Sequence, residues 1–406
     1  MIKKIRVKNF KSFKDMELNL GKVNILIGAN GSGKSNFVRI FEFLKDIAKD
    51  GLDKAISKDG YKYIKNINSN ELSIDITFDQ PPDMQDEKET KYSIFIKFKK
   101  DEAGIENIED KIIRNYKVFD SNTNDILDSG IMLLSNNNSE PNIQYISSIY
   151  EETPQKTLDT FKSYIYQNLI DTMKIKKEKS LLESPYSNMF FDAYEKPFSE
   201  ISIYDLDPQL SKKAIPIDWS SELAKNGENL VNVVLMEILQ NPEKKRMFLN
   251  LVTYLLPYIE DIEVDKFTET HFYLRMKETY SEKHYLPAPL ISDGTINALG
   301  LIVALYFQES PLIIIEEPDR GFHPSLISSV VEMMKDAAKY GNKQIIVTTH
   351  NPIMIKHADP EDVFLVSRDK EGFSQIHKPI DKDEVKIFLE NEMRLVDLYE
   401  TNLLEI

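Results

Sequence analysis

The chain opens with apolar and polar positions that alternate with a period of two, as in a β-strand. The alternation runs over residues 5–10, breaks at 11–14 and resumes over 16–20, which predicts two strands joined by a turn. A mostly apolar run, Val23–Ile27, then leads into a glycine-rich stretch and a helical pattern from Ser35 to Ile47. The pattern predicts a strand, a loop and a helix in succession.

The pattern of apolar and polar residues changes twice in the middle of the chain. Alternation returns at 72–78 and 92–98, which predicts two strands of an antiparallel sheet. Residues 120–154 are rich in Asn, Ser and Asp, a composition that favours exposed loops. From 157 to 259 the pattern is mostly helical, and the clearest amphipathic runs are 229–240 and 244–259.

The last third alternates helices with strands. Strand patterns at 262–267 and 271–276 are followed by predicted helices at 294–307 and 324–340 and by wholly apolar strands at 311–315 and 344–347. Continuous Ile/Val strands between helices predict a parallel sheet buried on both faces. We therefore predict an α/β protein with an N-terminal lobe over 1–120, a loop-rich and helical insertion over 121–260, and a C-terminal lobe over 261–406.

Composition narrows the class of protein. The chain has 406 residues, a net charge of −15 and no cysteine, so disulfides and cysteine-ligated zinc are excluded. No run approaches the roughly 18 apolar residues of a membrane span, and the start is strand-like rather than a signal peptide, so we expect a cytoplasmic protein without a membrane partner. The acidic balance argues against nucleic-acid binding over the whole surface. The clearest local basic runs are Lys97–Lys100 and Lys174–Lys179.

A phosphate-binding loop lies between the first apolar strand and its helix. Residues Gly28–Ser35 fit the pattern GxxxxGKS/T at each fixed position. Glycines let the backbone N–H groups of Asn30, Gly31, Ser32 and Gly33 turn inward, and the following helix adds its positive end. Lys34 would reach the β- and γ-phosphates of ATP, and the Ser35 hydroxyl would hold Mg²⁺.

Acidic residues and a histidine follow the next apolar strands. Glu316 and Glu317 end the strand at 311–315, and His350 follows the strand at 344–347. Ligands of α/β sheets bind at the carboxyl ends of the strands, so these side chains should face the phosphate loop. We predict that Glu316 completes the Mg²⁺ shell and that Glu317 orients and deprotonates the attacking water. His350 would contact the γ-phosphate or that water.

Five segments together resemble, in their order, the motifs of ABC-type ATPases of the RecF and SMC kind: VKNFKSFKD, GANGSGKSN, LISDGTINAL, IIIEEPDRGFHP and VTTHNP. The resemblance covers residues 1–50 and 285–406. It implies a mixed sheet around a phosphate-loop core with an inserted, largely helical region. It also implies that Ser292 and Gly294 belong to a signature loop that caps ATP bound by a second copy. The chain would therefore form a homodimer through ATP. By the same resemblance, Asp319 lies where the two copies join. Glu316 stands where the family often has Asp, and we recognise no Q-loop glutamine.

Within this group the chain resembles compact stand-alone ATPases of bacterial anti-phage defence systems. The segments 203–210, 222–239 and 396–406 look like recurring segments of that group, which implies an ATP-hydrolysing sensor or scaffold that controls a separately encoded effector such as a nuclease. The residues after His350 are too few for the nuclease domain that some relatives carry. The alternative is a RecF-like DNA-repair ATPase that engages DNA directly.

Overall fold

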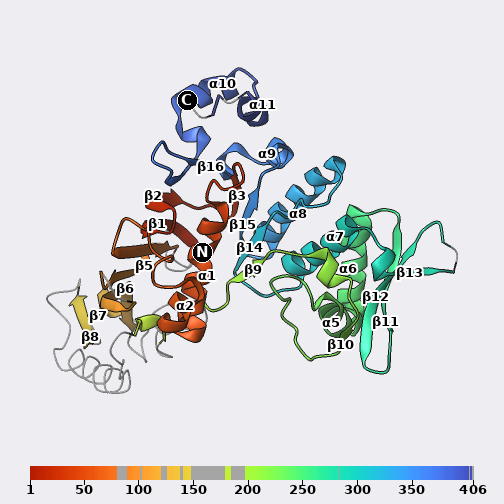
Figure 1. Ribbon diagram of the computed structural model, residues 1–406, viewed down its shortest axis with the longest axis horizontal. Helices are drawn as coiled ribbons and strands as arrows, with labels where there is room; N and C mark the ends of the chain where they lie inside the picture. Colours follow the sequence, from red (N-terminus) through yellow and green to blue (C-terminus); the bar gives the residue numbers. More distant parts are fainter. Residues whose placement is uncertain are drawn as a thin grey trace. The chain divides into compact units, whose positions relative to one another are not determined.

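The computed structural model divides the chain into two compact units, which we describe separately (Figure 1). Unit 1 contains residues 1–20, 36–200 and 367–376, and unit 2 contains residues 21–35, 201–366 and 377–406. The structure describes residues 1–79, 89–100, 103–119, 126–137, 140–147, 179–183, 197–281, 283–401 and 403–404. This division differs from the three successive segments expected from the sequence, because the phosphate loop belongs to unit 2 and the chain crosses between the units several times.

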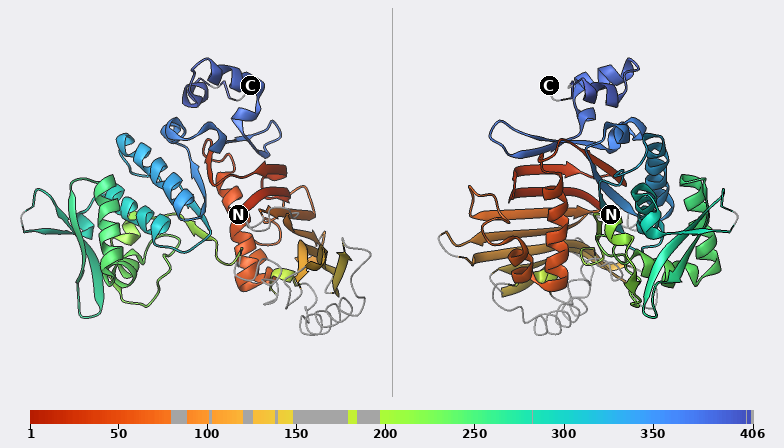
Figure 2. Two further views of the ribbon diagram at one scale, coloured as in Figure 1. Left: turned by 180° about the vertical axis from the view of Figure 1, so that it is seen from behind. Right: turned by 45° about the vertical axis from the view of Figure 1, so that its right-hand side comes forward.

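Unit 1 is built on an antiparallel sheet of strand order β2-β1-β4-β5-β6-β7-β8. Its strands are β1 (Ile2–Phe10), β2 (Phe13–Asn19), β4 (Glu71–Phe78), β5 (Thr90–Phe98), β6 (Ile105–Phe119), β7 (Ile126–Asn137) and β8 (Glu140–Ser147). The alternation of buried and exposed residues in β4 and β5 confirms the predicted antiparallel strands. Helix α1 (Lys34–Asp50) lies across one face of this sheet (Figure 2), and its Phe43 ring packs 5.9 Å from that of Phe10.

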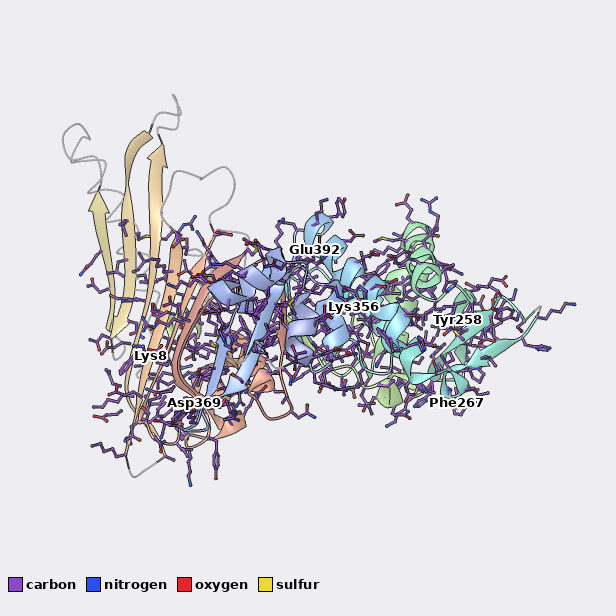
Figure 3. The ribbon with its side chains drawn as sticks, turned by 90° about the horizontal axis from the view of Figure 1, so that it is seen from above. Lys8, Tyr258, Phe267, Lys356, Asp369 and Glu392 are labelled. Carbon is purple, nitrogen blue, oxygen red and sulfur yellow. The ribbon has the colours of Figure 1, made fainter. Side chains whose placement is uncertain are left out.

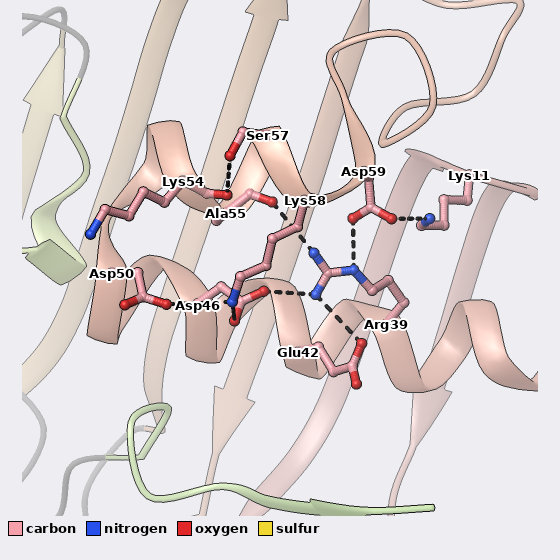
Figure 4. A network of polar contacts seen from close by, with 10 residues as sticks. All are labelled: Lys11, Arg39, Glu42, Asp46, Asp50, Lys54, Ala55, Ser57, Lys58 and Asp59. Atoms are coloured by element: carbon pink, nitrogen blue, oxygen red, sulfur yellow. Dashed lines mark hydrogen bonds and ion pairs between the residues drawn. The ribbon is translucent and has the colours of Figure 1, made fainter. Parts of the chain in front are cut away.

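A charged network joins α1 to the short helix α2 (Leu52–Asp59) within unit 1 (Figure 4). The Arg39 guanidinium donates from Nε to Asp59 over 2.6 Å and from Nη1 to Asp46 over 2.8 Å. Lys11 also donates to Asp59. Because Arg39 is mostly buried, these carboxylates supply the partners that its charge requires.

The expectation of exposed loops over 120–154 was wrong for the part that the structure describes. Residues 126–137 and 140–147 form β7 and β8, which pair with each other and extend the sheet of unit 1. Asn136 in β7 is buried, and its amide donates to Asp110 of β6 over 3.1 Å and to the Lys179 carbonyl over 2.9 Å. The polar end of β7 is tolerated here because distant residues accept both hydrogen bonds from the buried Asn136 amide nitrogen. The basic run 174–178 lies outside the described residues.

The predicted parallel sheet belongs mostly to unit 2, while the residues of its last two strands that lie within 367–376 are assigned to unit 1. Its strand order is β17-β16-β3-β15-β14-β9, with β3 (Val23–Ile27), β9 (Ser202–Tyr204), β14 (Leu312–Glu316), β15 (Gln344–Thr349), β16 (Val363–Arg368) and β17 (Ser374–His377). The pairs from β9 through β16 are parallel, and β3 and β15 are buried along their whole length. The edge strand β9 comes from the segment expected to be an insertion, and it is an integral part of this sheet.

Among the helices of unit 2, α8 (Ile327–Tyr340) and α9 (Pro352–His357) contact strands of the parallel sheet. The others are α4 (Pro208–Ser211), α5 (Leu230–Val233), α6 (Pro242–Leu255), α7 (Asp293–Tyr306), α10 (Asp383–Glu390) and α11 (Leu395–Glu400), and α5 continues as a π-helix over Val234–Leu239. Eleven consecutive residues of α7, from Thr295 to Leu305, are buried, which explains why it is hydrophobic on all sides. In the part of the chain that the structure describes, no helix combines the length and apolarity needed to cross a membrane.

A second antiparallel sheet completes unit 2. It has the order β10-β12-β11, with β13 paired to β12, and its strands are β10 (Ile215–Pro216), β11 (Ile259–Lys266), β12 (His271–Glu278) and β13 (Tyr285–Pro287). Tyr258 and Phe267, labelled in Figure 3, flank β11. The Tyr258 hydroxyl lies 2.9 Å from that of Thr295 in α7, so this sheet is tied to the start of the α7 helix.

Candidate nucleotide site

The phosphate loop follows β3, a fully buried strand of the parallel sheet. Gly31 and Gly33 have φ values of 79° and 122°, in the left-handed region that side chains rarely adopt. A Cβ on Gly28 would lie 2.1 Å from the Val366 carbonyl oxygen. Three glycines of the motif are therefore required by backbone geometry, and the loop has the shape that the sequence pattern predicted.

Lys34 begins α1 and reaches back over the loop. Its ammonium donates to the carbonyl oxygens of Gly28 over 2.7 Å and Ala29 over 3.0 Å. Burial lowers the pKa of Lys34, while the carboxylates of Glu317 and Glu316 act in the opposite direction. The lysine charge is therefore held within the loop, close to Glu316, the last residue of β14, and to Glu317, which follows it.

Ser35 and Glu316 meet at the end of the sheet. The Ser35 hydroxyl donates to Oε2 of Glu316 over 2.8 Å, which joins the first turn of α1 to the last residue of β14. Two oxygen ligands so close together suit Mg²⁺, a hard cation that takes few protein ligands and completes its coordination shell with phosphates and water. No cluster of three or more His, Cys, Asp or Glu side chains that could hold a metal occurs among the described residues.

Glu317 turns away from the strand direction. Its φ is 46°, an uncommon value for a residue other than glycine, and its amide donates to the Thr348 carbonyl over 2.8 Å. Nδ1 of His350 lies 2.9 Å from Oε1 of Glu317, while Arg320 donates from Nη2 to Oε2 over 3.2 Å. Partial burial raises the pKa of Glu317, but the bonds from His350 and Arg320 outweigh it, so the net pKa is lowered and the carboxylate stays ionised.

Arg320 is a site residue that sequence reasoning missed. It donates from Nη1 to the Leu206 carbonyl over 3.3 Å and pairs with Asp205 over 3.1 Å. Both partners follow the edge strand β9. Arg320 stands three residues after Glu317 in the sequence, and only the placement of β9 beside β14 shows that it links Glu317 to that edge strand. Asp319 is buried and accepts a bond of 3.0 Å from Thr349, which fixes the loop to β15.

The predicted signature residues begin α7. Ser292 caps this helix by accepting from the Thr295 amide over 3.1 Å. A Cβ on Gly294 would lie 2.4 Å from the Gly321 carbonyl oxygen, so the helix start packs directly on the loop that follows Glu317. The structure thus brings Lys34, Ser35, Glu316, Glu317 and His350 together, whereas the Ser292 hydroxyl bonds to Thr295 rather than to the phosphate loop.

These features define a phosphate-loop ATPase fold of the SMC head type. A solved SMC head, bound to the C-terminal winged-helix domain of ScpA, superposes with a TM-score of 0.50 at 16% identity, covering 93% of this chain and 96% of that one. Residues 23–355 match the family described as "AAA domain, putative AbiEii toxin, Type IV TA system". The chain belongs to this family. The expectation of an ABC-type ATPase of the RecF and SMC kind is confirmed.

Two curated relatives cover most of the chain. A protein of Helicobacter pylori named ATP/GTP phosphatase is 23% identical over 371 residues, which is 88% of each sequence. Endonuclease GajA of Bacillus cereus is 23% identical over 372 residues, which is 87% of this chain. The chain spans only 56% of that endonuclease, so the relative has a large part without a counterpart here.

Proposed function

We propose that the chain is a cytoplasmic ATPase that uses Glu317 as the general base for the hydrolysis of ATP. ATP and Mg²⁺ would bind to the phosphate loop, through Asn30, Gly31, Ser32, Gly33, Lys34 and Ser35. The observation that carries this proposal is the position of the ionised Glu317 carboxylate, held between His350 and Arg320 at the end of the sheet that also carries the phosphate loop. A base must be ionised and fixed within reach of the water that it deprotonates.

The residues divide the work of phosphoryl transfer. The Lys34 ammonium would leave the loop carbonyls for the β- and γ-phosphates, whose charge exceeds that of a carbonyl. Ser35 and Glu316 would hold Mg²⁺, which supplies charge neutralisation for the phosphates when bound. Glu317 would take the proton from the attacking water, and His350, whose side chain is 53% exposed, would hydrogen-bond the γ-phosphate or that water.

The proposed dimer rests on the signature loop. Ser292 and Gly294 place the N-terminal end of α7, a helix of 14 residues, at the surface, and such an end with a capping serine suits an anion. The Ser292 hydroxyl caps its own helix, and the resemblance of this loop to the signature loop of ABC-type ATPases supports a role in capping ATP held by a second copy. We propose that two copies pair head to tail around two ATP molecules.

The proposed biological role is control of a separate effector in anti-phage defence. Two observations support it: the relative named as an endonuclease extends well beyond the matched region, and the solved SMC head was captured with a domain of another protein. A nuclease or other effector would then bind the ATP-closed dimer. The acidic net charge of −15 favours a protein partner over extended contact with nucleic acid.

A single set of variants tests hydrolysis and pairing. Glu317→Gln should bind ATP, lower kcat by at least about 100-fold and accumulate as a dimer, measured by light scattering with ATP and Mg²⁺. Ser292→Arg should remain a monomer with unchanged ATP affinity, while Ser292→Asn keeps the helix cap and should pair. Wild-type turnover by Glu317→Gln would exclude it as the base. Purification of tagged Glu317→Gln from its host would identify the effector.

A further inference from the structure

The proposed signature loop contains a carboxylate at the place where a phosphate is expected to bind. Asp293 is the first residue of α7 and directly follows the capping Ser292. An acidic residue in the first turn stabilises a helix, because it interacts with the partial positive charge of the N-terminal end. The same negative charge opposes the approach of ATP to that end. A neighbouring cation is therefore needed if this loop is to accept a phosphate.

Two side chains of one short segment hold the Asp293 carboxylate. The Lys212 ammonium donates to Oδ1 of Asp293. The Gln209 side-chain amide donates to Oδ1 over 3.0 Å and to Oδ2 over 3.1 Å. These bonds lower the pKa of Asp293, chiefly through Lys212, so the carboxylate stays ionised. The Lys212 side chain is 12% exposed and that of Asp293 is 49% exposed, so the cation is mostly covered while the carboxylate faces solvent.

Hydrogen bonds to the chain just before α5 fix the segment that carries Lys212. The amide of Asp207, the residue that caps α4, donates to the Asn226 carbonyl over 3.0 Å. The hydroxyl of the buried Ser211 donates to the Gly227 carbonyl over 2.8 Å. The backbone on which the Lys212 side chain stands is therefore held in place, and the ammonium does not depend on a freely moving surface chain to reach its partner.

The other end of this segment contacts the loop that follows β14. Asp205 pairs with Arg320 over 3.1 Å, and the Leu206 carbonyl accepts from Arg320 over 3.3 Å. Arg320 in turn donates to the Glu317 carboxylate. From α7, the Asn297 side-chain amide donates to the Arg320 carbonyl over 2.7 Å. The segment 205–212 therefore contacts both the start of α7 and the residue that orients the proposed base.

We propose that Lys212 is a positioning residue for the ATP dimer, because it neutralises Asp293 and thereby lets the signature loop accept the γ-phosphate of ATP held by a second copy. This inference rests on the proposed dimer and adds to it the residue that makes an acidic signature loop compatible with a phosphate. Lys212 need not contact ATP in this role. Without it, the loop presents Ser292 beside an uncompensated carboxylate, and pairing weakens because like charges repel.

The first test measures ATP-dependent pairing by sedimentation equilibrium with ATP and Mg²⁺, in the Glu317→Gln background that should hydrolyse slowly. Lys212→Met removes the charge but keeps most of the stem, and it should raise the dimer dissociation constant about tenfold. Lys212→Arg keeps the charge and should pair within about twofold of the background. Lys213→Met, at the next and exposed lysine, is the matched control and should pair normally. Equal pairing by Lys212→Met and the background would overturn the proposal.

The second test separates charge from packing. Adding Asp293→Asn to Lys212→Met removes the repelling carboxylate and should restore pairing to within about threefold of the background. Higher salt should also narrow the gap between Lys212→Met and the background, because exposed charges are screened. A pairing defect that persists in the double variant would refute neutralisation, since removal of the carboxylate repairs neither lost packing nor a lost contact between Lys212 and a phosphate.

Two controls separate this inference from the dimer on which it rests. Lys212→Met should bind a fluorescent ATP analogue as a monomer with unchanged affinity, because the phosphate loop is not altered, and this reports an intact fold. If the Glu317→Gln background itself stays monomeric with ATP, the proposed dimer fails and the role of Lys212 fails with it. If the background pairs and Lys212→Met pairs equally well, the dimer stands and only the role of Lys212 is wrong.

Discussion

Nδ1 of His350 lies 2.9 Å from the Glu317 carboxylate, although the two residues belong to different loops. They meet because β14 and β15 are parallel neighbours in which Glu316 is paired with Thr348, so the residue after one strand faces the residues after the other. Parallel strands bring their carboxyl ends to one edge of the sheet. The catalytic proposal depends on this register.

Arg320 should act as a positioning residue for Glu317. Arg320→Ala removes the charge that holds Oε2 of Glu317, and we expect kcat to fall about tenfold with little change in KM, because the base is displaced while the phosphate loop is untouched. Arg320→Lys should recover part of the rate, since it keeps the charge but loses the forked geometry. A rise in KM at constant kcat would instead indicate a role in ATP binding.

Lys34 should determine ATP affinity. We expect Lys34→Ala to weaken ATP binding by roughly 10- to 100-fold, in line with the loss of charged hydrogen bonds of about 1.5–3 kcal/mol. Binding of a fluorescent ATP analogue measures the change. Lys22→Ala, an exposed lysine just before β3, serves as the matched control and should bind normally. Unchanged affinity of Lys34→Ala would contradict the assignment of the phosphate loop.

Gly294 should tolerate no side chain. Its Cβ would lie 2.4 Å from the Gly321 carbonyl oxygen, so Gly294→Ala must displace the start of α7 or the loop after Glu317, at a cost of about 1–3 kcal/mol in the free energy of unfolding. Gly21→Ala is the control, because its Cβ would lie 3.6 Å from the nearest atom. Urea unfolding compares the two. We also expect Gly294→Ala to lose ATP-dependent pairing, and normal pairing with wild-type stability would refute the close packing.

Asp110 should make the stability of unit 1 depend on pH. Complete burial raises its pKa to about 6, against hydrogen bonds from Ser180, Leu181 and Asn136 that lower it. The folded chain therefore holds this proton more tightly than the unfolded chain, so the contribution of Asp110 to the free energy of unfolding is greatest below its ordinary pKa of 3.8 and declines as pH rises to about 6. The shift corresponds to a loss of about 3 kcal/mol at most.

The measurement for Asp110 is a difference between two variants. Other carboxylates have lowered pKa values and act in the opposite direction, so the free energy of unfolding is compared between the wild type and Asp110→Asn from pH 4 to 7. The advantage of the wild type over Asp110→Asn should shrink as the pH rises. A constant difference would show that Asp110 titrates alike in the folded and unfolded chains.

The sequence by itself determined most of the local structure. The period-two alternation predicted β1, β2, β4 and β5, and the apolar runs predicted β3, β14 and β15. A strand buried on one face has apolar residues at every second position, and a strand buried on both faces is apolar throughout. The phosphate loop was equally clear from its motif, and glycine adopts without strain the positive φ values found at Gly31 and Gly33. These signals come from neighbouring residues and need no knowledge of distant contacts.

Only the tertiary structure determined which residues that are distant in the sequence contact each other. The polar segment that became β7 was expected to form loops, and its buried Asn136 is accommodated by Asp110 and by the Lys179 carbonyl. The Arg320–Asp205 pair likewise joins segments separated by many residues. Strand order and register determine such contacts. The sequence shows which side chains are present, but it does not show which of them are paired in the fold.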